Sequence, residues 1–176
     1  SLRTVGLTPP ENYMSRYPHE ISGGQRQRVS IARTLVMKPK FVVCDEPTSM
    51  LDVSIRISIM DLMLNLAKEL DVSYLYITHD LAVARYMCNR IAVMFNGKIV
   101  EIAETEELLN NPIHPYTKRL ISSIPIPDPS YKRERYEMNF DELDNIIQNN
   151  PNEKMVNIGS EHFVATHETK DLFIES

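Results

Sequence analysis

The stretch Ile21-Ser22-Gly23-Gly24-Gln25-Arg26-Gln27-Arg28 decides how the chain is interpreted, and an apolar-striped run follows it as far as Lys38-Pro39. Serine is a favoured residue at the N-cap of a helix, so the pattern predicts a helix that starts at Ser22. Gly23 and Gly24 have no Cβ, which lets the free backbone N–H groups of the first helical turn approach an anion closely. The same residues, taken alone, also fit a capped turn without a ligand.

Composition limits the classes of protein to which the chain can belong. Its 176 residues are 43% hydrophobic, which is enough for a compact domain with a buried core. Residues 1–130 hold 14 basic and 14 acidic side chains, whereas residues 131–176 hold 5 basic and 10 acidic ones. Because neither part has a basic excess, nucleic acid is not expected as a partner. The two cysteines, Cys44 and Cys88, form no Cys-x-x-Cys pair, so neither a zinc site nor a disulfide framework is predicted.

Two apolar runs predict neighbouring parallel strands. Phe41–Cys44 ends abruptly at Asp45-Glu46-Pro47, and Val72–Ile77 ends at Thr78-His79-Asp80. Continuous apolar runs of this length are typical of strands that are buried on both faces. Helices are predicted from Asp52 to Leu70, from Leu81 to Met87, from Thr105 to Asn111-Pro112 and from Tyr116 to Ser123. The alternation of strands and helices predicts an α/β fold.

The second half of the chain predicts antiparallel structure and then an extension. Asn96-Gly97 lies between the apolar runs Ile91–Phe95 and Lys98–Ile102, and this dipeptide is the strongest short signal for a hairpin turn. The composition then becomes rich in proline, and we expect this extension to add little to the main apolar pattern. Its predicted elements beyond the Tyr116 helix are a weak helix at Phe140–Ile147 and a small hairpin of Met155–Ile158 with His162–Ala165.

Three polar groups are expected to meet at the carboxyl edge of the predicted parallel sheet. They are the helix start at Ser22, the pair Asp45-Glu46, and His79. Ligands bind at this edge in open α/β sheets. Two adjacent carboxylates there suit phosphoryl transfer, in which one acid holds Mg2+ and the other positions and deprotonates the attacking water. Taken singly, the acidic pair also fits a strand-ending turn, and His79 fits an ordinary loop histidine.

In this order, the motifs resemble those of the ATP-binding-cassette (ABC) ATPases over roughly residues 14–103. The likeness lies in a signature loop at Ile21–Gln25, a Walker B strand with its catalytic acid at Phe41–Glu46, a D-loop at Ser49–Asp52 and a switch histidine at His79. The resemblance implies the C-terminal part of a P-loop NTPase fold. That fold has a mainly parallel sheet with helices, here with an added antiparallel hairpin and a Pro-rich C-terminal extension.

The resemblance also implies roles for individual residues. Glu46 is the implied general base and His79 the implied sensor of the γ-phosphate, so these two are the expected catalytic residues. Asp45 is implied to help hold Mg2+. The implied ATP-site residues are Ser22, Gly23, Gly24 and Gln25, which serve the nucleotide of the opposite subunit, and Asp52, which communicates across a dimer.

A second resemblance narrows the substrate class. Asn111–Leu120, followed by Ile124-Pro125 and Pro127-Asp128-Pro129, resembles the C-terminal extension of ATPases that serve oligopeptide and dipeptide importers. Some members of that group carry a cysteine cluster in this extension. Since no cysteine follows Cys88, an iron–sulfur centre is not expected.

One family motif, the phosphate-binding loop Gly-x-x-x-x-Gly-Lys-Ser/Thr, is absent from these residues. The single Gly-Lys pair, Gly97-Lys98, is followed by Ile99 and falls in the predicted hairpin turn. We therefore expect a fragment that neither binds nor hydrolyses ATP alone. Its expected parts are the end of a helical subdomain with the signature (residues 1–38), part of the catalytic core (residues 39–111) and the importer-type extension (residues 112–176).

By resemblance, the complete protein is expected to be an ATPase that energises an importer of oligopeptides or dipeptides. The implied partners are a second ABC ATPase subunit, identical or related, and transmembrane permease subunits, with a peptide-binding protein acting indirectly. The implied location is the cytoplasmic face of the cell membrane, as a peripheral subunit. Two alternatives stay open: a non-transport ABC ATPase, and a truncated interaction module without enzyme activity.

Overall fold

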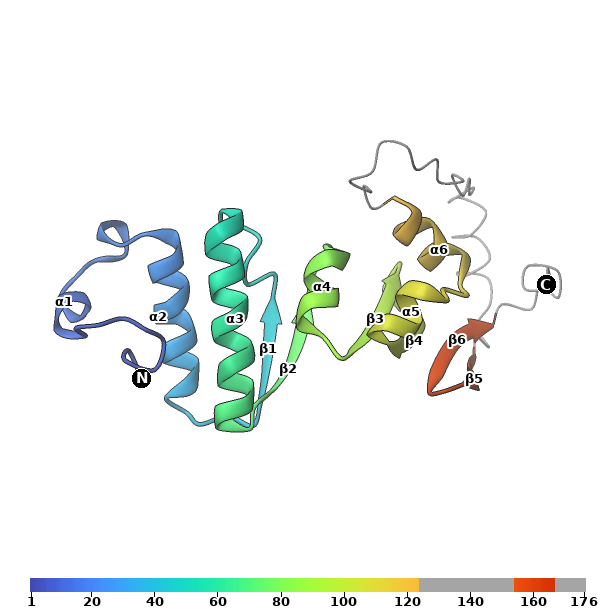
Figure 1. Ribbon diagram of the computed structural model, residues 1–176, viewed down its shortest axis with the longest axis horizontal. Helices are drawn as coiled ribbons and strands as arrows, with labels where there is room; N and C mark the ends of the chain where they lie inside the picture. Colours follow the sequence, from blue (N-terminus) through green and yellow to red (C-terminus); the bar gives the residue numbers. More distant parts are fainter. Residues whose placement is uncertain (124–153, 167–176) are drawn as a thin grey trace. The chain divides into compact units, whose positions relative to one another are not determined.

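The computed structural model describes residues 1–123 and 154–166 of the chain. It divides into two compact units, Ser1–His79 and Asp80–Ser176, each with its own packed core (Figure 1). In the part of the chain that the structure describes, no helix is both long enough and apolar enough to cross a lipid bilayer.

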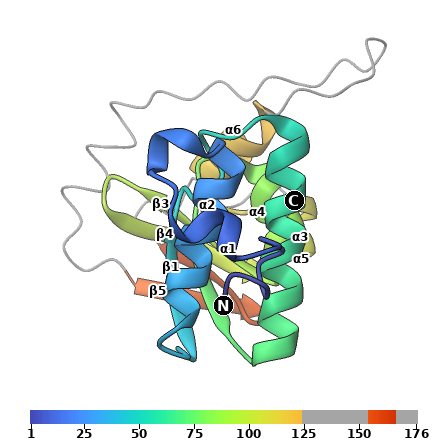
Figure 2. The ribbon, with the colours of Figure 1, turned by 90° about the vertical axis from the view of Figure 1, so that its left-hand side faces the viewer.

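The first unit combines two long helices with a parallel strand pair. Its elements are α1 (Glu11–Met14), a 3-10 helix (Pro18–Glu20), α2 (Gly23–Leu35), β1 (Phe41–Asp45), α3 (Val53–Leu70) and β2 (Ser73–Ile77). The strands pair in parallel from Phe41 opposite Ser73 to Asp45 opposite Ile77, so the predicted parallel pair is confirmed. The helices α2 and α3 run side by side (Figure 2).

The core of this unit forms where the N-terminal segment meets α2 and α3. Its buried residues are Val5, Leu7, Ala32 and Leu66. The guanidinium of Arg28 donates hydrogen bonds to the backbone oxygen of Val5 at 2.7 Å and to the hydroxyl of Ser58 at 2.8 Å. Arg28 therefore fastens the N-terminal segment to both long helices.

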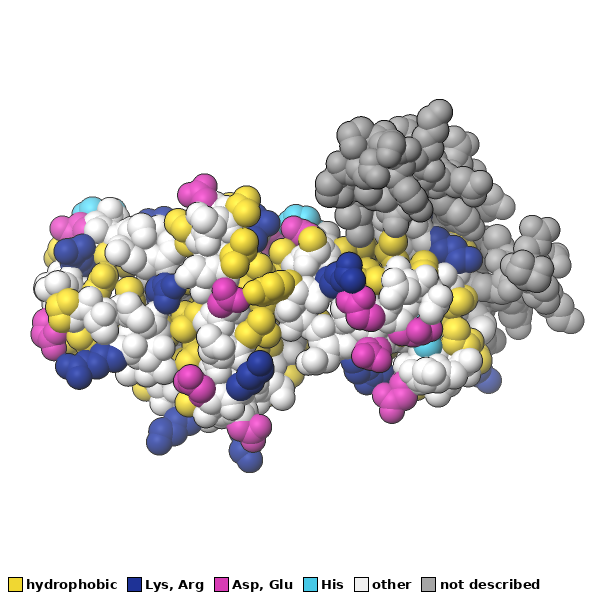
Figure 3. Space-filling view, viewed as in Figure 1, with side chains coloured by type: hydrophobic (Ala, Val, Ile, Leu, Met, Phe, Trp, Pro, Cys, Tyr) yellow, Lys and Arg dark blue, Asp and Glu magenta, His cyan; other side chains and the backbone are white. Residues whose placement is uncertain are grey.

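One face of the β1–β2 pair is open to solvent. Its side chains are apolar and about half exposed: Phe41 (58%), Val43 (55%), Leu75 (50%) and Ile77 (46%). The alternate residues Cys44 and Tyr74 are partly buried. In the described residues only one face of the pair is covered, although apolar runs of this kind are typical of strands that are buried on both faces. Figure 3 shows hydrophobic side chains gathered at the surface over α3 and this strand pair.

The second unit is built on an antiparallel sheet with strand order β3-β4-β6-β5. Its elements are α4 (Leu81–Met87), β3 (Arg90–Phe95), β4 (Lys98–Glu104), α5 (Thr105–Asn110), α6 (Pro115–Ser122), β5 (Lys154–Gly159) and β6 (His162–Thr166). Asn96 and Gly97 have φ angles of 46° and 78°, the left-handed conformation that a tight two-residue turn requires. Both predicted hairpins are confirmed, and the C-terminal one extends the same sheet.

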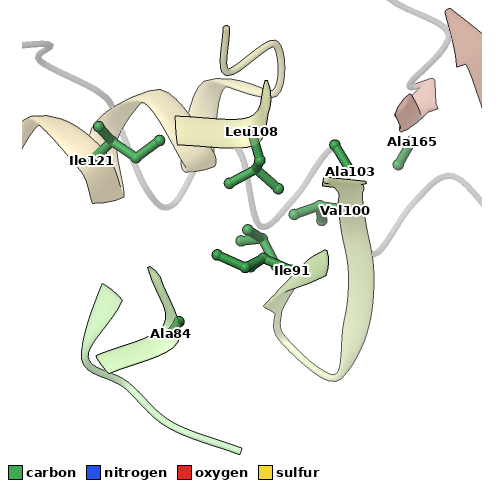
Figure 4. Packing of buried hydrophobic residues seen from close by; sticks show 8 residues of the cluster. Ala84, Ile91, Val100, Ala103, Leu108, Ile121 and Ala165 are labelled. Atoms are coloured by element: carbon green, nitrogen blue, oxygen red, sulfur yellow. The ribbon is translucent and has the colours of Figure 1, made fainter. Parts of the chain in front are cut away.

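The core of the second unit draws side chains from every element except β5 (Figure 4). The buried residues are Ala84, Ile91, Val93, Val100, Ala103, Leu108, Ile121 and Ala165. Ile121 and Ala165 belong to the proline-rich extension. The expectation that the extension adds little to the apolar pattern is therefore wrong, since both residues pack in the same cluster as the β3–β4 hairpin.

The predicted boundaries after residues 38 and 111 differ from the division into units, which falls after His79. The three-part organisation refers to subdomains of a larger family fold and stays a prediction. α6 spans Pro115–Ser122, one residue earlier than predicted at each end. The weak helix predicted at Phe140–Ile147 lies outside the described residues.

Candidate functional site

The predicted helix start is a complete capping box. The Ser22 hydroxyl accepts a hydrogen bond from the backbone N–H of Gln25 at 3.3 Å, and the Ser22 N–H donates to the Gln25 side chain at 3.0 Å. These contacts satisfy groups that the beginning of a helix otherwise leaves unpaired. Ser22 and Gln25 therefore have a structural role, and their contact with ATP stays a prediction.

The two glycines that follow Ser22 differ in their surroundings. A Cβ on Gly24 would lie 2.6 Å from Cγ2 of Ile55, so the packing of α2 on α3 excludes a side chain there. A Cβ on Gly23 would make only an ordinary contact, with Cδ2 of Leu51 at 3.5 Å as its nearest neighbour. Helix packing thus explains the glycine at position 24, whereas close approach of a ligand remains a reason that fits Gly23.

Asp45 and Glu46 lie at the carboxyl end of β1, as predicted. Asp45 is the last residue of the strand, and both side chains are exposed. Glu46 has a φ angle of 43°, which is uncommon for a residue with a Cβ. Its N–H donates to the backbone oxygen of Ile77 at 3.0 Å, and its carbonyl accepts from the Ser49 hydroxyl at 3.0 Å. The bond to Ile77 holds the backbone of Glu46 next to the end of β2, and the bond from Ser49 lies within the loop after β1.

His79 contacts Glu46 directly. Nδ1 of His79 lies 2.8 Å from Oε1 of Glu46, and because a carboxylate can only accept, Nδ1 is the donor. The side chains remain accessible, with 76% of His79 and 44% of Glu46 exposed. This hydrogen bond is the main reason that the pKa of Glu46 lies below its ordinary value of 4.5. Glu46 is therefore held in its ionised form.

A cavity of about 470 Å³ lies between α2 and β1 in the first unit. Its lining includes Gly23, Arg26, Asp45 and Glu46. The structure thus brings the start of α2 and the acidic pair to one cavity, which is part of the predicted arrangement. Other predicted site residues do not line it; they are Ser22, Gly24, Gln25, Asp52 and His79.

The loop between β1 and α3 contains two residues whose positions matter here. Asp52 is the exposed N-cap residue of α3, but its side chain makes no capping hydrogen bond. Thr48 is 3% exposed, and its hydroxyl lies 2.9 Å from the hydroxyl of Tyr76 on β2. This contact anchors the loop that carries Glu46. Sequence reasoning missed it because a threonine in a loop gives no signal of burial.

The residues present fit a phosphate-bound magnesium ion. Mg2+ prefers oxygen ligands and is commonly held by one or two carboxylates together with phosphate oxygens, and Asp45 and Glu46 offer two exposed carboxylates. Among the described residues, no group of three or more His, Cys, Asp or Glu side chains could hold a metal by itself. A magnesium ion held by Asp45 and Glu46 would need further oxygen ligands. The 13-residue helix α2 adds N-terminal backbone N–H groups that favour an anion.

Comparison with known protein families defines the class. Residues 1–49 match the family described as "ABC transporter". The chain belongs to the ATP-binding-cassette family. Residues 100–155 match "Oligopeptide/dipeptide transporter, C-terminal region". The two matches lie in different parts of the chain, the first at its beginning and the second in its C-terminal half.

Similar proteins carry matching names. The oligopeptide transport ATP-binding protein AmiF of Streptococcus pneumoniae is 57% identical over 134 residues, which cover 76% of this chain and 43% of that protein. OppF of Bacillus subtilis, also an oligopeptide transport ATP-binding protein, is 46% identical over 169 residues, covering 96% of this chain and 55% of OppF. The dipeptide transport ATP-binding protein DppF of Lactococcus lactis is 48% identical, with coverages of 96% and 53%.

A solved structure agrees with the fold. The ADP conformation of MJ1267, an ATP-binding cassette of an ABC transporter, is 30% identical with a TM-score of 0.55, and the match covers 63% of this chain and 44% of that one. The described α/β structure is therefore consistent with the P-loop NTPase fold. The chain spans about half the length of the curated relatives it matches.

Proposed function

We propose that the complete protein is the ATP-hydrolysing subunit of an importer for oligopeptides or dipeptides. The contact between Glu46 and His79 carries this proposal, because it joins an ionised carboxylate to an imidazole beside the ends of two parallel strands. Asp45 adds the second carboxylate on the same strand. The names of the similar oligopeptide and dipeptide transport proteins support the substrate class.

The three side chains divide the work of hydrolysis. Bound ATP with Mg2+ supplies the phosphoryl group and its charge neutralisation. Asp45 would hold the metal through its exposed carboxylate, and Glu46 would orient a water molecule and accept its proton. The hydrogen bond from His79 lowers the pKa of Glu46 and so makes it a weaker base. Glu46 therefore becomes a better proton acceptor when His79 turns its N–H to a phosphate oxygen instead.

The signature residues face a second ATPase subunit in this proposal. Ser22 is exposed at the beginning of α2, and Gly23 lines the cavity between α2 and β1. Gly24 and Gln25 hold the helix start in place, through packing on Ile55 and through the capping box respectively. Asp52 is exposed and free of a capping bond, which suits contact across a dimer.

The importer function also implies membrane partners. A peptide importer needs permease subunits that span the bilayer, and the described residues contain no such helix. The protein is therefore proposed to act as a peripheral subunit on the cytoplasmic side, beside its second ATPase. A peptide-binding protein would deliver the substrate without contacting this chain.

Reconstitution tests the proposal. The complete protein is combined with its second ATPase, its permease subunits and its peptide-binding protein in lipid vesicles. Uptake of a labelled pentapeptide and of a labelled dipeptide is then measured beside ATP hydrolysis. We expect peptide uptake that requires ATP and hydrolysis that rises when peptide is present. Vesicles without permeases are the control, and a labelled sugar tests substrate class. If the rate of ATP hydrolysis is the same with and without peptide and no peptide is taken up, the protein belongs to another class of ABC ATPase.

A further inference from the structure

Glu101 on β4 is a buried carboxylate that the proposed hydrolysis does not use. Its side chain is fully buried. Oε1 accepts hydrogen bonds from the backbone N–H of Ile113 at 2.8 Å and from Nε2 of His162 at 2.7 Å, and Oε2 accepts from the N–H of His114 at 3.0 Å. Since an unpaired buried charge is very costly, these donors are what allow a carboxylate at this position.

His162 is the residue through which the C-terminal hairpin reaches this carboxylate. Its side chain is 2% exposed, and Nδ1, the nitrogen that does not face Glu101, lies 3.6 Å from Oε1 of Glu107 on α5. Both ring nitrogens thus face acidic oxygens. His114, also buried, uses Nδ1 to accept the N–H of Tyr116 and so caps α6. Of these groups, only His162 comes from the C-terminal hairpin.

The C-terminal hairpin pairs with the rest of the sheet over a short length of strand. β6 pairs with β4 at two positions, Glu101 with Val164 and Ile102 with Phe163. The outer strand β5 is exposed along its whole length. A two-stranded hairpin alone is marginally stable in water, so this one depends on its docking to β4. Its docked residues are few: His162, Val164 and Ala165 are buried.

The C-terminal hairpin depends on the Glu101 site more than the Glu101 site depends on the hairpin. If the hairpin leaves, Glu101 keeps two backbone donors, from Ile113 and His114, in a turn that is close to it in sequence. His162 would lose its carboxylate partners, and the hairpin would lose β4, its one neighbour in the sheet among the described strands. The carboxylate with its two backbone donors, here called the Glu101 cradle, therefore survives without the hairpin, whereas the hairpin does not survive without the cradle.

From this asymmetry we propose that residues 154–166 form a detachable strap, whose folded state depends on insertion of His162 into a preformed Glu101 cradle. The strap is a conformational device at the end of the extension, separate from the proposed ATP chemistry. The family match to the extension ends at residue 155, so nearly all of the strap lies beyond it. Release of the strap would open β4 as a free sheet edge while α6 stays capped.

Hydrogen–deuterium exchange on the complete protein tests the strap. In His162→Ala, we expect exchange of the amides in 154–166 to rise at least about tenfold, while amides in 113–121 stay within about twofold of the parent. His162→Gln keeps a side-chain N–H donor, so its exchange in 154–166 should fall between that of the parent and that of His162→Ala. Val156→Thr is the matched control, because Val156 lies on the exposed strand opposite Val164 and should leave both segments unchanged.

Replacing Glu101 should change hydrogen exchange in a different pattern from replacing His162. Glu101→Ala takes away the acceptor of both backbone donors, so exchange should rise in 113–121 as well as in 154–166. Two results would overturn the proposal. One is protection of 154–166 that persists in His162→Ala. The other is equal loss of protection in 113–121 and 154–166 in that variant, which would make the hairpin a fixed part of the core.

Discussion

Nδ1 of His79 lies 2.8 Å from Oε1 of Glu46, so the residues that follow two parallel strands are joined by a hydrogen bond. The strands are adjacent in space, although the two side chains are 33 positions apart in the chain. The bond holds the candidate base as an ionised acceptor. It also occupies Oε1 of that carboxylate, while Oε2 accepts no hydrogen bond from His79.

Replacing His79 should raise the pKa of Glu46. The hydrogen bond from His79 is the largest cause of the lowered value, so His79→Ala should return the pKa toward 4.5. Because the folded-state pKa is lowered, this contact favours the fold above pH 4.5, and its contribution is lost as the pH falls through the lowered value. NMR titration of the Glu46 carboxyl carbon measures the titration midpoint in the parent and in His79→Ala, each as the nucleotide-free complete protein. Identical midpoints would show that the contact does not persist in solution.

Glu46→Gln should separate ATP binding from hydrolysis in the complete protein. The amide keeps the size of the side chain but cannot accept a proton, and loss of a general base typically lowers the rate about 10²–10⁴-fold. Steady-state phosphate release measures the rate, and equilibrium binding of labelled ATP checks that affinity is kept. Glu69→Gln, at the exposed end of α3, is the matched control and should hydrolyse ATP normally. A rate within a few-fold of the parent would remove Glu46 from the catalytic role.

Gly24→Ala should destabilise the protein, and Gly23→Ala should not. The new methyl at position 24 would lie 2.6 Å from Ile55, whereas at position 23 the nearest atom is at 3.5 Å. Overpacking of this kind typically costs about 1–3 kcal/mol, and alanine in place of glycine otherwise favours a helix. Urea denaturation of the complete variants compares their free energies of unfolding. Equal stability of the two variants would mean that α2 and α3 separate easily at this contact.

The 176-residue chain expressed alone should self-associate. The open face of the β1–β2 pair presents Phe41, Val43, Leu75 and Ile77, each about half exposed. Contiguous apolar surface of this kind favours association in water. Size-exclusion chromatography with light scattering at micromolar concentration measures the mass. The double variant Val43→Lys, Leu75→Lys should shift the chain toward monomer, whereas Met37→Lys, at an 82% exposed position elsewhere, should not. A monodisperse parent chain would contradict the prediction.

Deleting residues 112–176 from the complete protein should lower its thermal stability. The deletion removes Ile121 and Ala165 from the core of the second unit and leaves the buried Glu101 carboxylate without its three donors. Loss of partners around a buried charge typically costs about 3–5 kcal/mol. Calorimetry compares this variant with one that lacks only residues 167–176. If both melt like the parent, the extension is independent of the β3–β4 sheet.

The sequence by itself determined the features that depend on neighbouring residues. Ser22 and Gln25 form a capping box because their spacing lets each reach the other's backbone or side chain within one helical turn. Asn96-Gly97 forms a hairpin turn because both residues tolerate a positive φ. The acidic pair follows an apolar strand, so its place at a strand end could be read directly.

The tertiary structure decided what depends on contacts between distant positions. Glu101 sits in an alternating strand pattern that suggests an ordinary exposed residue, but it is buried because donors from residues 113, 114 and 162 converge on it. Gly24 needs its missing Cβ because Ile55, 31 positions later, packs against it. No local pattern encodes these distances, since they arise only when separate elements pack. The same holds for the bond between His79 and Glu46, which exists because two strands pair in one register.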